Sequence, residues 1–136
     1  MCIRDRLEEH PALAAKLFEQ FPLDRRNEHA EGEAGFIPIQ PSCYGSDGVL
    51  RTFYHGHYFR SALRHDAALI DEAGLAALDA YDALCEDPDM HLDMWLKPGD
   101  MQFISNHTIV HARTGFEDWP EPERRRHLLR LWLSLE

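Results

Sequence analysis

Hydrophobic positions repeat at helical spacing in two early segments of the chain and at strand spacing in its last third. The helical spacing predicts one helix over residues 7–21, with Pro11 in its first turn, and Pro22 ends it. A second and clearer helix is predicted over residues 71–85, where apolar side chains recur at Leu75, Leu78, Tyr81 and Cys85. The polar stretch from 24 to 35 has no apolar period and is expected to be a loop.

From His91 onward the period changes to two, which indicates strands whose alternate side chains share a face. Residues 91–135 are therefore predicted to form antiparallel strands, at residues 91–96, 101–105, 108–112 and 127–135. Two earlier strands are predicted at residues 36–39 and 49–54. A Gly-Ser-Asp-Gly turn lies between them, so they are candidates for a hairpin.

These elements predict a mainly β fold with helical insertions, as an antiparallel sandwich or jelly roll. A doubly wound parallel sheet is not expected, because strands and helices do not alternate. A jelly roll needs about eight strands, whereas the pattern supplies about six. We therefore expect the sequence to be truncated at its N-terminus.

Composition limits the classes of partner. The 136 residues suffice for one domain, and a formal net charge of -10 argues against nucleic acid as the main partner. A small anion is still possible, because one or two arginines can hold it whatever the net charge. No apolar run is long enough to span a membrane, and the start lacks the apolar core of a secretory signal, so a cytoplasmic location is expected by default.

The most informative motifs lie between Leu96 and Leu135. A turn at Pro98-Gly99-Asp100 is followed by Asn106, then by a His-x-Arg motif at His111 and Arg113, then by an arginine-rich segment with Arg126 and Arg130. This order resembles the C-terminal half of the TauD/TfdA family of iron(II)/2-oxoglutarate-dependent dioxygenases, in the clavaminate synthase-like superfamily. The resemblance continues more loosely back to Leu7, through a helix, Asp24-Arg25-Arg26, a hairpin and a helix.

The resemblance implies a double-stranded β-helix that uses Fe(2+), with 2-oxoglutarate and molecular oxygen as cosubstrates. It implies that His111 is a metal ligand, that Arg126 binds the distal carboxylate of 2-oxoglutarate, and that Arg130 binds substrate or assists Arg126. No catalytic residue beyond the metal ligand is assigned. The expected substrate is a small organic molecule of acidic or zwitterionic character, and formation of a homo-oligomer is left open.

The resemblance also predicts what the sequence lacks. Members carry a His-x-Asp/Glu pair of iron ligands far upstream, and no equivalent precedes residue 7. Residues 1–6, MCIRDR, resemble translated sequencing-adapter readthrough, so they are expected to be an artefactual start. Residues 7–136 are then the C-terminal part of a dioxygenase domain.

Two other pairs of residues could be metal ligands. His91 and Asp93 form a His-x-Asp, but in a strand where the family has no ligand; His55 and His57 fall in a region used for packing and substrate access. The rival functions are an inactive fragment or non-catalytic cupin-like binding module, and a small metal-binding cupin that uses His91, Asp93 and His111.

Overall fold

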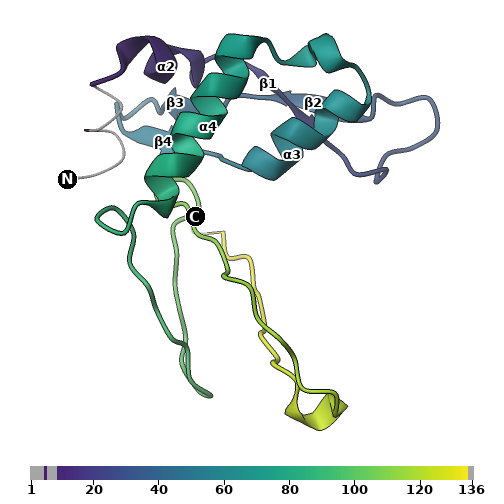
Figure 1. Ribbon diagram of the computed structural model, residues 1–136, viewed down its shortest axis with the longest axis vertical. Helices are drawn as coiled ribbons and strands as arrows, with labels where there is room; N and C mark the ends of the chain where they lie inside the picture. Colours follow the sequence, from purple (N-terminus) through teal and green to yellow (C-terminus); the bar gives the residue numbers. More distant parts are fainter. Residues whose placement is uncertain (1–4, 6–8, 135–136) are drawn as a thin grey trace.

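The structure is a computed structural model that describes residue 5 and residues 9–134. It consists of a folded body, residues 9–90, and a C-terminal arm, residues 91–134. The arm leaves the body below the end of the longest helix as two extended excursions (Figure 1). No helix within the described ranges is both long and apolar enough to cross a membrane.

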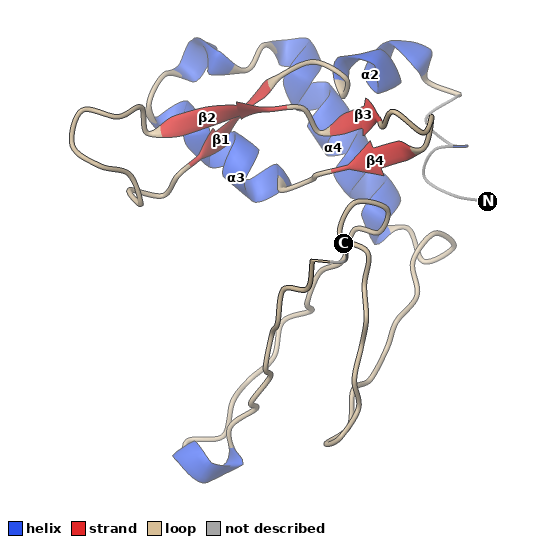
Figure 2. Ribbon diagram, turned by 180° about the vertical axis from the view of Figure 1, so that it is seen from behind, coloured by secondary structure: helices blue, strands red, loops and turns tan. Residues whose placement is uncertain are grey.

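The strands of the body form two separate antiparallel pairs (Figure 2). In the first pair, β1 (Phe21–Asp24) lies beside β2 (Phe36–Ile39), with Phe21 opposite Ile39. In the second pair, β3 (Ser42–Tyr44) lies beside β4 (Leu50–Thr52). The tight turn between β3 and β4 places Gly48 at φ 74°, a conformation that glycine adopts without steric cost.

Helices cover one face of these strands. The longest, α4 (Glu72–Glu86), crosses both strand pairs on the same side (Figures 1 and 2). Its N-cap is Asp71, whose Oδ1 accepts from the Gly74 backbone N–H at 2.7 Å. The shorter helices are α2 (Pro11–Lys16) and α3 (Gly56–Ser61), and the 3-10 turns are η1 (Ala62–Arg64), η2 (Ala67–Leu69) and η3 (Pro122–Arg124).

The core of the body lies between α4 and its neighbours, in two clusters. One cluster joins Phe21 of β1 to the buried residues Phe59, Ile70 and Leu78. The other joins Leu17, Ala77 and Tyr81, and Val110 of the arm packs against it. Hydrophobic burial therefore stabilises the body as a unit and fixes one point of the arm to it.

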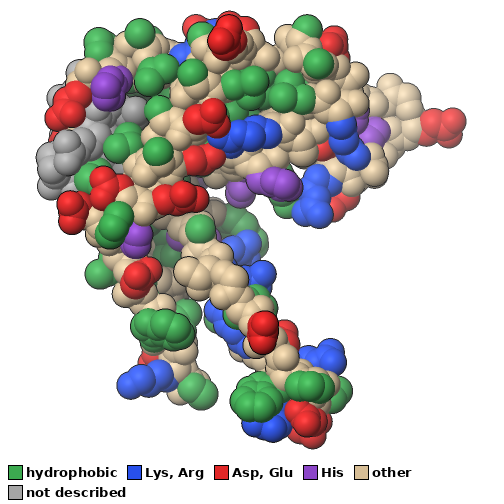
Figure 3. Space-filling model, viewed as in Figure 1, with side chains coloured by type: hydrophobic (Ala, Val, Ile, Leu, Met, Phe, Trp, Pro, Cys, Tyr) green, Lys and Arg blue, Asp and Glu red, His purple; other side chains and the backbone are tan. Residues whose placement is uncertain are grey.

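The arm contains no strand within the residues that the structure describes, and its only regular element is η3. Most of its large apolar side chains are exposed, with Trp95 at 92%, and Figure 3 shows hydrophobic side chains on the surface along the arm. One backbone hydrogen bond, from the Thr52 N–H to the His107 carbonyl at 2.7 Å, joins β4 to the arm beside Val110.

The predicted strands over residues 91–135 are therefore not found in residues 91–134; residue 135 lies outside the described residues. Alternation determines which side chains share a face, but a strand also needs a neighbour that pairs with its N–H and C=O groups. No other described segment forms such a ladder of hydrogen bonds with the arm. The described residues do not close a jelly roll.

The sequence predictions for the body have mixed outcomes. The helix over residues 71–85 is confirmed by α4, and the strands at 36–39 and 49–54 are found as β2 and the shorter β4. The hairpin between those two strands is wrong, because β2 pairs with β1 and β4 with β3. The predicted helix over residues 7–21 is longer than the one found in its described part, because α2 spans Pro11–Lys16 and Phe21 begins a strand; residues 7 and 8 lie outside the described residues.

The division into body and arm predicts different costs for two leucine truncations. Leu78→Ala removes a fully buried side chain and should lower the free energy of unfolding by about 2–5 kcal/mol. Leu131→Ala removes a side chain that is exposed in the arm and should change it by less than about 0.5 kcal/mol. Urea denaturation followed by far-UV circular dichroism measures both. Equal losses in the two variants would contradict this division.

Candidate functional site

The predicted metal ligand, His111, lies on the arm just after its attachment to the body. Its Nε2 is 3.1 Å from Asn106 Oδ1, so the structure joins two residues of the C-terminal motif. A neutral imidazole that donates from Nε2 carries its lone pair on Nδ1, the atom that could then bind a metal. The Thr52–His107 bond and Val110 position this segment against the body.

His55, at the N-cap of α3, lies within electrostatic range of the arm. Burial lowers the pKa of His55, and the charges of His111 and Arg130 lower it further. Its ring meets Phe53 edge-on at 5.0 Å between centroids and stacks on Tyr58 at 5.4 Å. The structure therefore brings His111 and Arg130 into the electrostatic range of α3.

The other predicted site residue, Arg126, has a different environment. Its backbone N–H donates to Asp118 Oδ1 at 3.1 Å, and its guanidinium lies 5.4 Å from the Phe116 ring centroid. The Arg130 guanidinium lies 5.7 Å from the Trp132 ring centroid. Both side chains are exposed. No hydrogen bond or ion pair in the described part of the chain joins Arg126 to His111, so the site prediction remains a prediction.

A three-ligand metal centre is not assembled by the residues that the structure describes. No three of their His, Cys, Asp or Glu side chains gather closely enough to hold an ion. His91 Nε2 lies 3.7 Å from Asp93 Oδ1, but these two do not form a cluster with His111. Two histidines and a carboxylate are the usual donors to iron in this class of site. The described residues thus offer one predicted ligand and do not complete that set.

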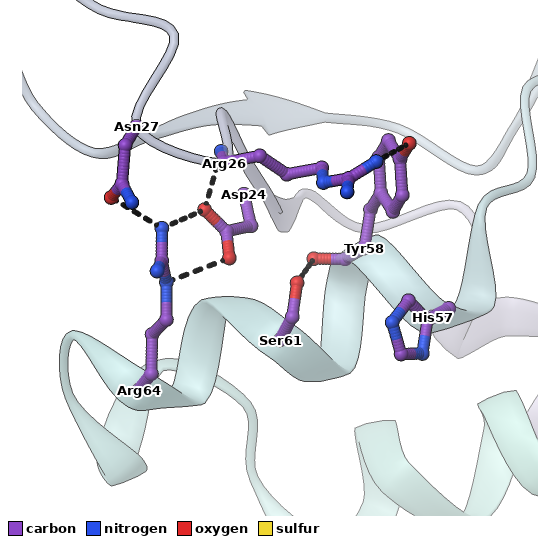
Figure 4. A pocket seen from close by; sticks show the side chains of 7 residues that line it. All are labelled: Asp24, Arg26, Asn27, His57, Tyr58, Ser61 and Arg64. Atoms are coloured by element: carbon purple, nitrogen blue, oxygen red, sulfur yellow. Dashed lines mark hydrogen bonds and ion pairs between the residues drawn. The ribbon is translucent and has the colours of Figure 1, made fainter.

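A concavity of the body, which we call the Asp24 pocket, lies between α3 and the turn after β1 (Figure 4). Its volume is about 310 Å³. Polar and charged side chains line it: Asp24, Arg26, Asn27, His57, Tyr58, Ser61 and Arg64.

Asp24 is the buried anchor of this pocket, with only 2% of its side chain exposed. Arg64 grips it with two nitrogens, Nε at 2.9 Å from Oδ2 and Nη2 at 3.0 Å from Oδ1, and the Arg26 backbone N–H donates to Oδ1 at 2.8 Å. Burial alone would raise the pKa of the carboxyl. The hydrogen bonds from Arg26, Ser61, Arg64 and His65 outweigh it and hold the pKa well below its usual range.

The turn that follows Asp24 directs the side chains of Arg26 and Asn27. Arg26 and Asn27 both adopt positive φ, 54° and 67°, which is uncommon for residues other than glycine. Asn27 Oδ1 accepts from Arg64 Nη2 at 2.8 Å, and Arg26 Nη1 donates to the Tyr58 hydroxyl at 2.7 Å. Figure 4 shows Arg26 extending over the pocket toward Tyr58 while Arg64 approaches Asp24 from the opposite side.

Comparison with known proteins identifies the class. The model of the family described as "Taurine catabolism dioxygenase TauD, TfdA family" matches residues 5–132, and the chain belongs to this family. Among characterised relatives it is similar to FR-33289 synthase from Streptomyces rubellomurinus (strain ATCC 31215), with 39% identity over 132 residues. The match covers 96% of this chain and 39% of that protein, so the chain spans about two fifths of its relative's length.

Family membership confirms the resemblance found from the motifs at Pro98–Gly99–Asp100 and His111. The family implies a jelly-roll fold, of which the described residues show short strands and helices. The Asp24-Arg25-Arg26 string is part of the resemblance, but nothing in the sequence predicts the Asp24 pocket. Its partner Arg64 is forty residues away, with no spacing signal to connect the two.

The lowered pKa of Asp24 predicts a specific loss of stability in acid. A carboxyl whose folded-state pKa is depressed stabilises the fold above its unfolded-state pKa, about 4, and loses that contribution as the pH falls toward the folded value. Urea midpoints of the unaltered chain should therefore fall between pH 6 and pH 3 more steeply than those of Asp24→Asn. Parallel pH profiles of the two proteins would refute the assignment.

Proposed function

We propose that this chain is part of an Fe(II)/2-oxoglutarate-dependent dioxygenase that hydroxylates a small organic substrate of acidic or zwitterionic character. The main support is the family match over residues 5–132, together with the motif from Pro98 to Arg130. Bound iron, 2-oxoglutarate and oxygen would supply the oxidising chemistry, and the protein would supply geometry and charge.

Three residues receive roles in this proposal. His111 contributes one imidazole ligand to iron, and its hydrogen bond to Asn106 fixes the plane of its ring. Arg126 neutralises the distal carboxylate of 2-oxoglutarate through a two-pronged contact that lysine cannot reproduce. Arg130, which lies within electrostatic range of His55 together with His111, contacts the substrate or assists Arg126.

We further propose that the arm supplies strands of the jelly roll when partner strands lie beside it. Its alternating apolar side chains are exposed and its backbone is extended, as expected of strands without neighbours. The relative is more than twice as long as the matched segment, which leaves room in that protein for the remaining strands and iron ligands. Residues 7–136 then correspond to the C-terminal part of the domain.

The role of Arg126 can be tested in an active dioxygenase that contains this chain. Arg126→Ala should weaken 2-oxoglutarate binding roughly ten- to hundredfold, because it removes a charge-assisted pair of hydrogen bonds. Arg126→Lys should recover only part of the lost 2-oxoglutarate affinity, because lysine restores the positive charge but cannot donate two parallel hydrogen bonds to the carboxylate. Arg124→Ala is the matched control, because the Arg124 guanidinium lies 3.4 Å from the Trp119 ring centroid. This variant should bind 2-oxoglutarate as tightly as the unaltered protein. Equal effects of Arg124→Ala and Arg126→Ala would contradict the role.

Iron binding by the 136-residue chain alone gives a second test. One predicted ligand, with no three-donor cluster in the described ranges, should not hold Fe(II) tightly. Calorimetric titration of Fe(II) under argon, with and without 2-oxoglutarate, should show no tight one-to-one site. Tight binding that is lost in Asp93→Ala would establish His91 and Asp93 as ligands and overturn this proposal for the iron site. In the active dioxygenase, His111→Ala should abolish iron binding.

A further inference from the structure

The Asp24 pocket carries a net positive charge on a strongly acidic chain. Two guanidinium groups, those of Arg26 and Arg64, face a single carboxylate. Arg64 is committed to that carboxylate through both of its contacting nitrogens. The side-chain hydrogen-bond partner of Arg26 is the neutral hydroxyl of Tyr58. A positive charge thus lines the pocket without a carboxylate bonded to it, although the whole chain carries -10.

The donors in the pocket suit an oxyanion. The Tyr58 hydroxyl accepts from Arg26, so its own proton is available to a ligand, and the remaining N–H groups of Arg26 can donate beside it. Arg64 and the Asn27 amide line the same space. A volume of about 310 Å³ is at the small end of the range for ligand pockets, which fits one charged group and a short connecting chain.

Two aromatic rings connect the pocket with the side of the body that faces the predicted iron ligand. Tyr58, which lines the pocket, stacks on His55 with ring centroids 5.4 Å apart. His55 in turn lies within the electrostatic range of His111 and Arg130. Tyr58 and His55, at the start of α3, therefore lie between Arg26 and His111.

We propose that the Asp24 pocket binds the oxyanion group of the substrate, a carboxylate or a phosphoryl group, through Arg26 and Tyr58. Bound there, the anionic end would hold the rest of the molecule toward the predicted iron ligand. The assignment of this oxyanion to the substrate rests on the function proposed above. The oxyanion site itself stands on the geometry of the body alone.

Inorganic phosphate is the probe for the first experiment, followed by calorimetry and by nuclear magnetic resonance shifts of the Tyr58 and Arg26 backbone amides. The 136-residue chain is used without iron and without 2-oxoglutarate, so the result does not depend on whether His111 ligates iron. Phosphate should bind saturably at one site. Arg26→Gln should weaken it at least tenfold, and Tyr58→Phe roughly three- to tenfold.

Arg25→Gln is the matched control. Arg25 is the neighbouring arginine, its guanidinium is paired with Glu33 at 2.6 Å, and it does not line the pocket. This variant changes the net charge as much as Arg26→Gln does, so it controls for a general effect of charge on phosphate binding. If the pocket is specific, its phosphate affinity should stay within about twofold of that of the unaltered chain. Loss of phosphate binding in both variants to the same extent, or in neither, would overturn the proposal. Tyr58→Phe keeps the test valid if Arg26→Gln does not fold.

A second experiment separates substrate from cosubstrate, because both can carry oxyanions. 2-Oxoglutarate and succinate are titrated against the phosphate-bound chain and against Arg26→Gln. The proposal expects short anions of either chemistry to compete with phosphate, with 2-oxoglutarate no stronger than succinate. Displacement by 2-oxoglutarate that is tenfold stronger than by succinate and depends on Arg26 would reassign the pocket to the cosubstrate and overturn its assignment to substrate.

Discussion

The carboxylate of Asp24 is the interaction on which the arrangement of the body depends. A charged group with 2% of its side chain exposed is tolerated only when its hydrogen-bonding capacity is filled, and here donors arrive from two separate parts of the chain. Satisfying it fixes the turn after β1 and the 3-10 turn η1 against each other. Phe21, three residues earlier on β1, is then placed to pack on Phe59 and Leu78. The polar anchor and the hydrophobic core therefore determine the same packing of β1 on the helices.

The same anchor explains why the pocket is charged. The charges of Arg64 and Asp24 balance each other. The turn at Arg26 and Asn27 places a second guanidinium beside this pair, so the pocket has a net positive charge. Positive φ at two consecutive side-chain-bearing residues costs free energy, and such strain accumulates where function needs a particular geometry. The hydrogen bond between Arg26 and Tyr58 connects this turn to α3 and, through the stacked ring of His55, to the region that the arm approaches.

How far the sequence predicts this structure depends on whether the deciding interactions are local. The helix over residues 71–85 was predictable because its apolar period, its N-cap Asp71 and Pro88 after its end all act within one segment. The pairing of β2 with β1 was not, because Pro22 indicates the end of a helix and the polar residues from Asp24 onward indicate a loop, and neither signal predicts a strand. His111 and Arg126 are predicted site residues because the order of a motif along the sequence points to them. The Asp24 pocket joins positions 24, 58 and 64, which no short motif connects.

The arm shows the limit of periodicity most clearly. Its alternation is as regular as that of a strand, yet each backbone N–H and C=O must find a partner, and periodicity says nothing about where that partner lies. The described contacts of the arm with the body are concentrated where Thr52 meets His107 and where Val110 packs on Tyr81 and its neighbours. His111 follows this attachment by a single residue. The body therefore holds the predicted ligand through the part of the arm that packs against it, whereas Arg126, fifteen residues further along, lies on an exposed part of the arm.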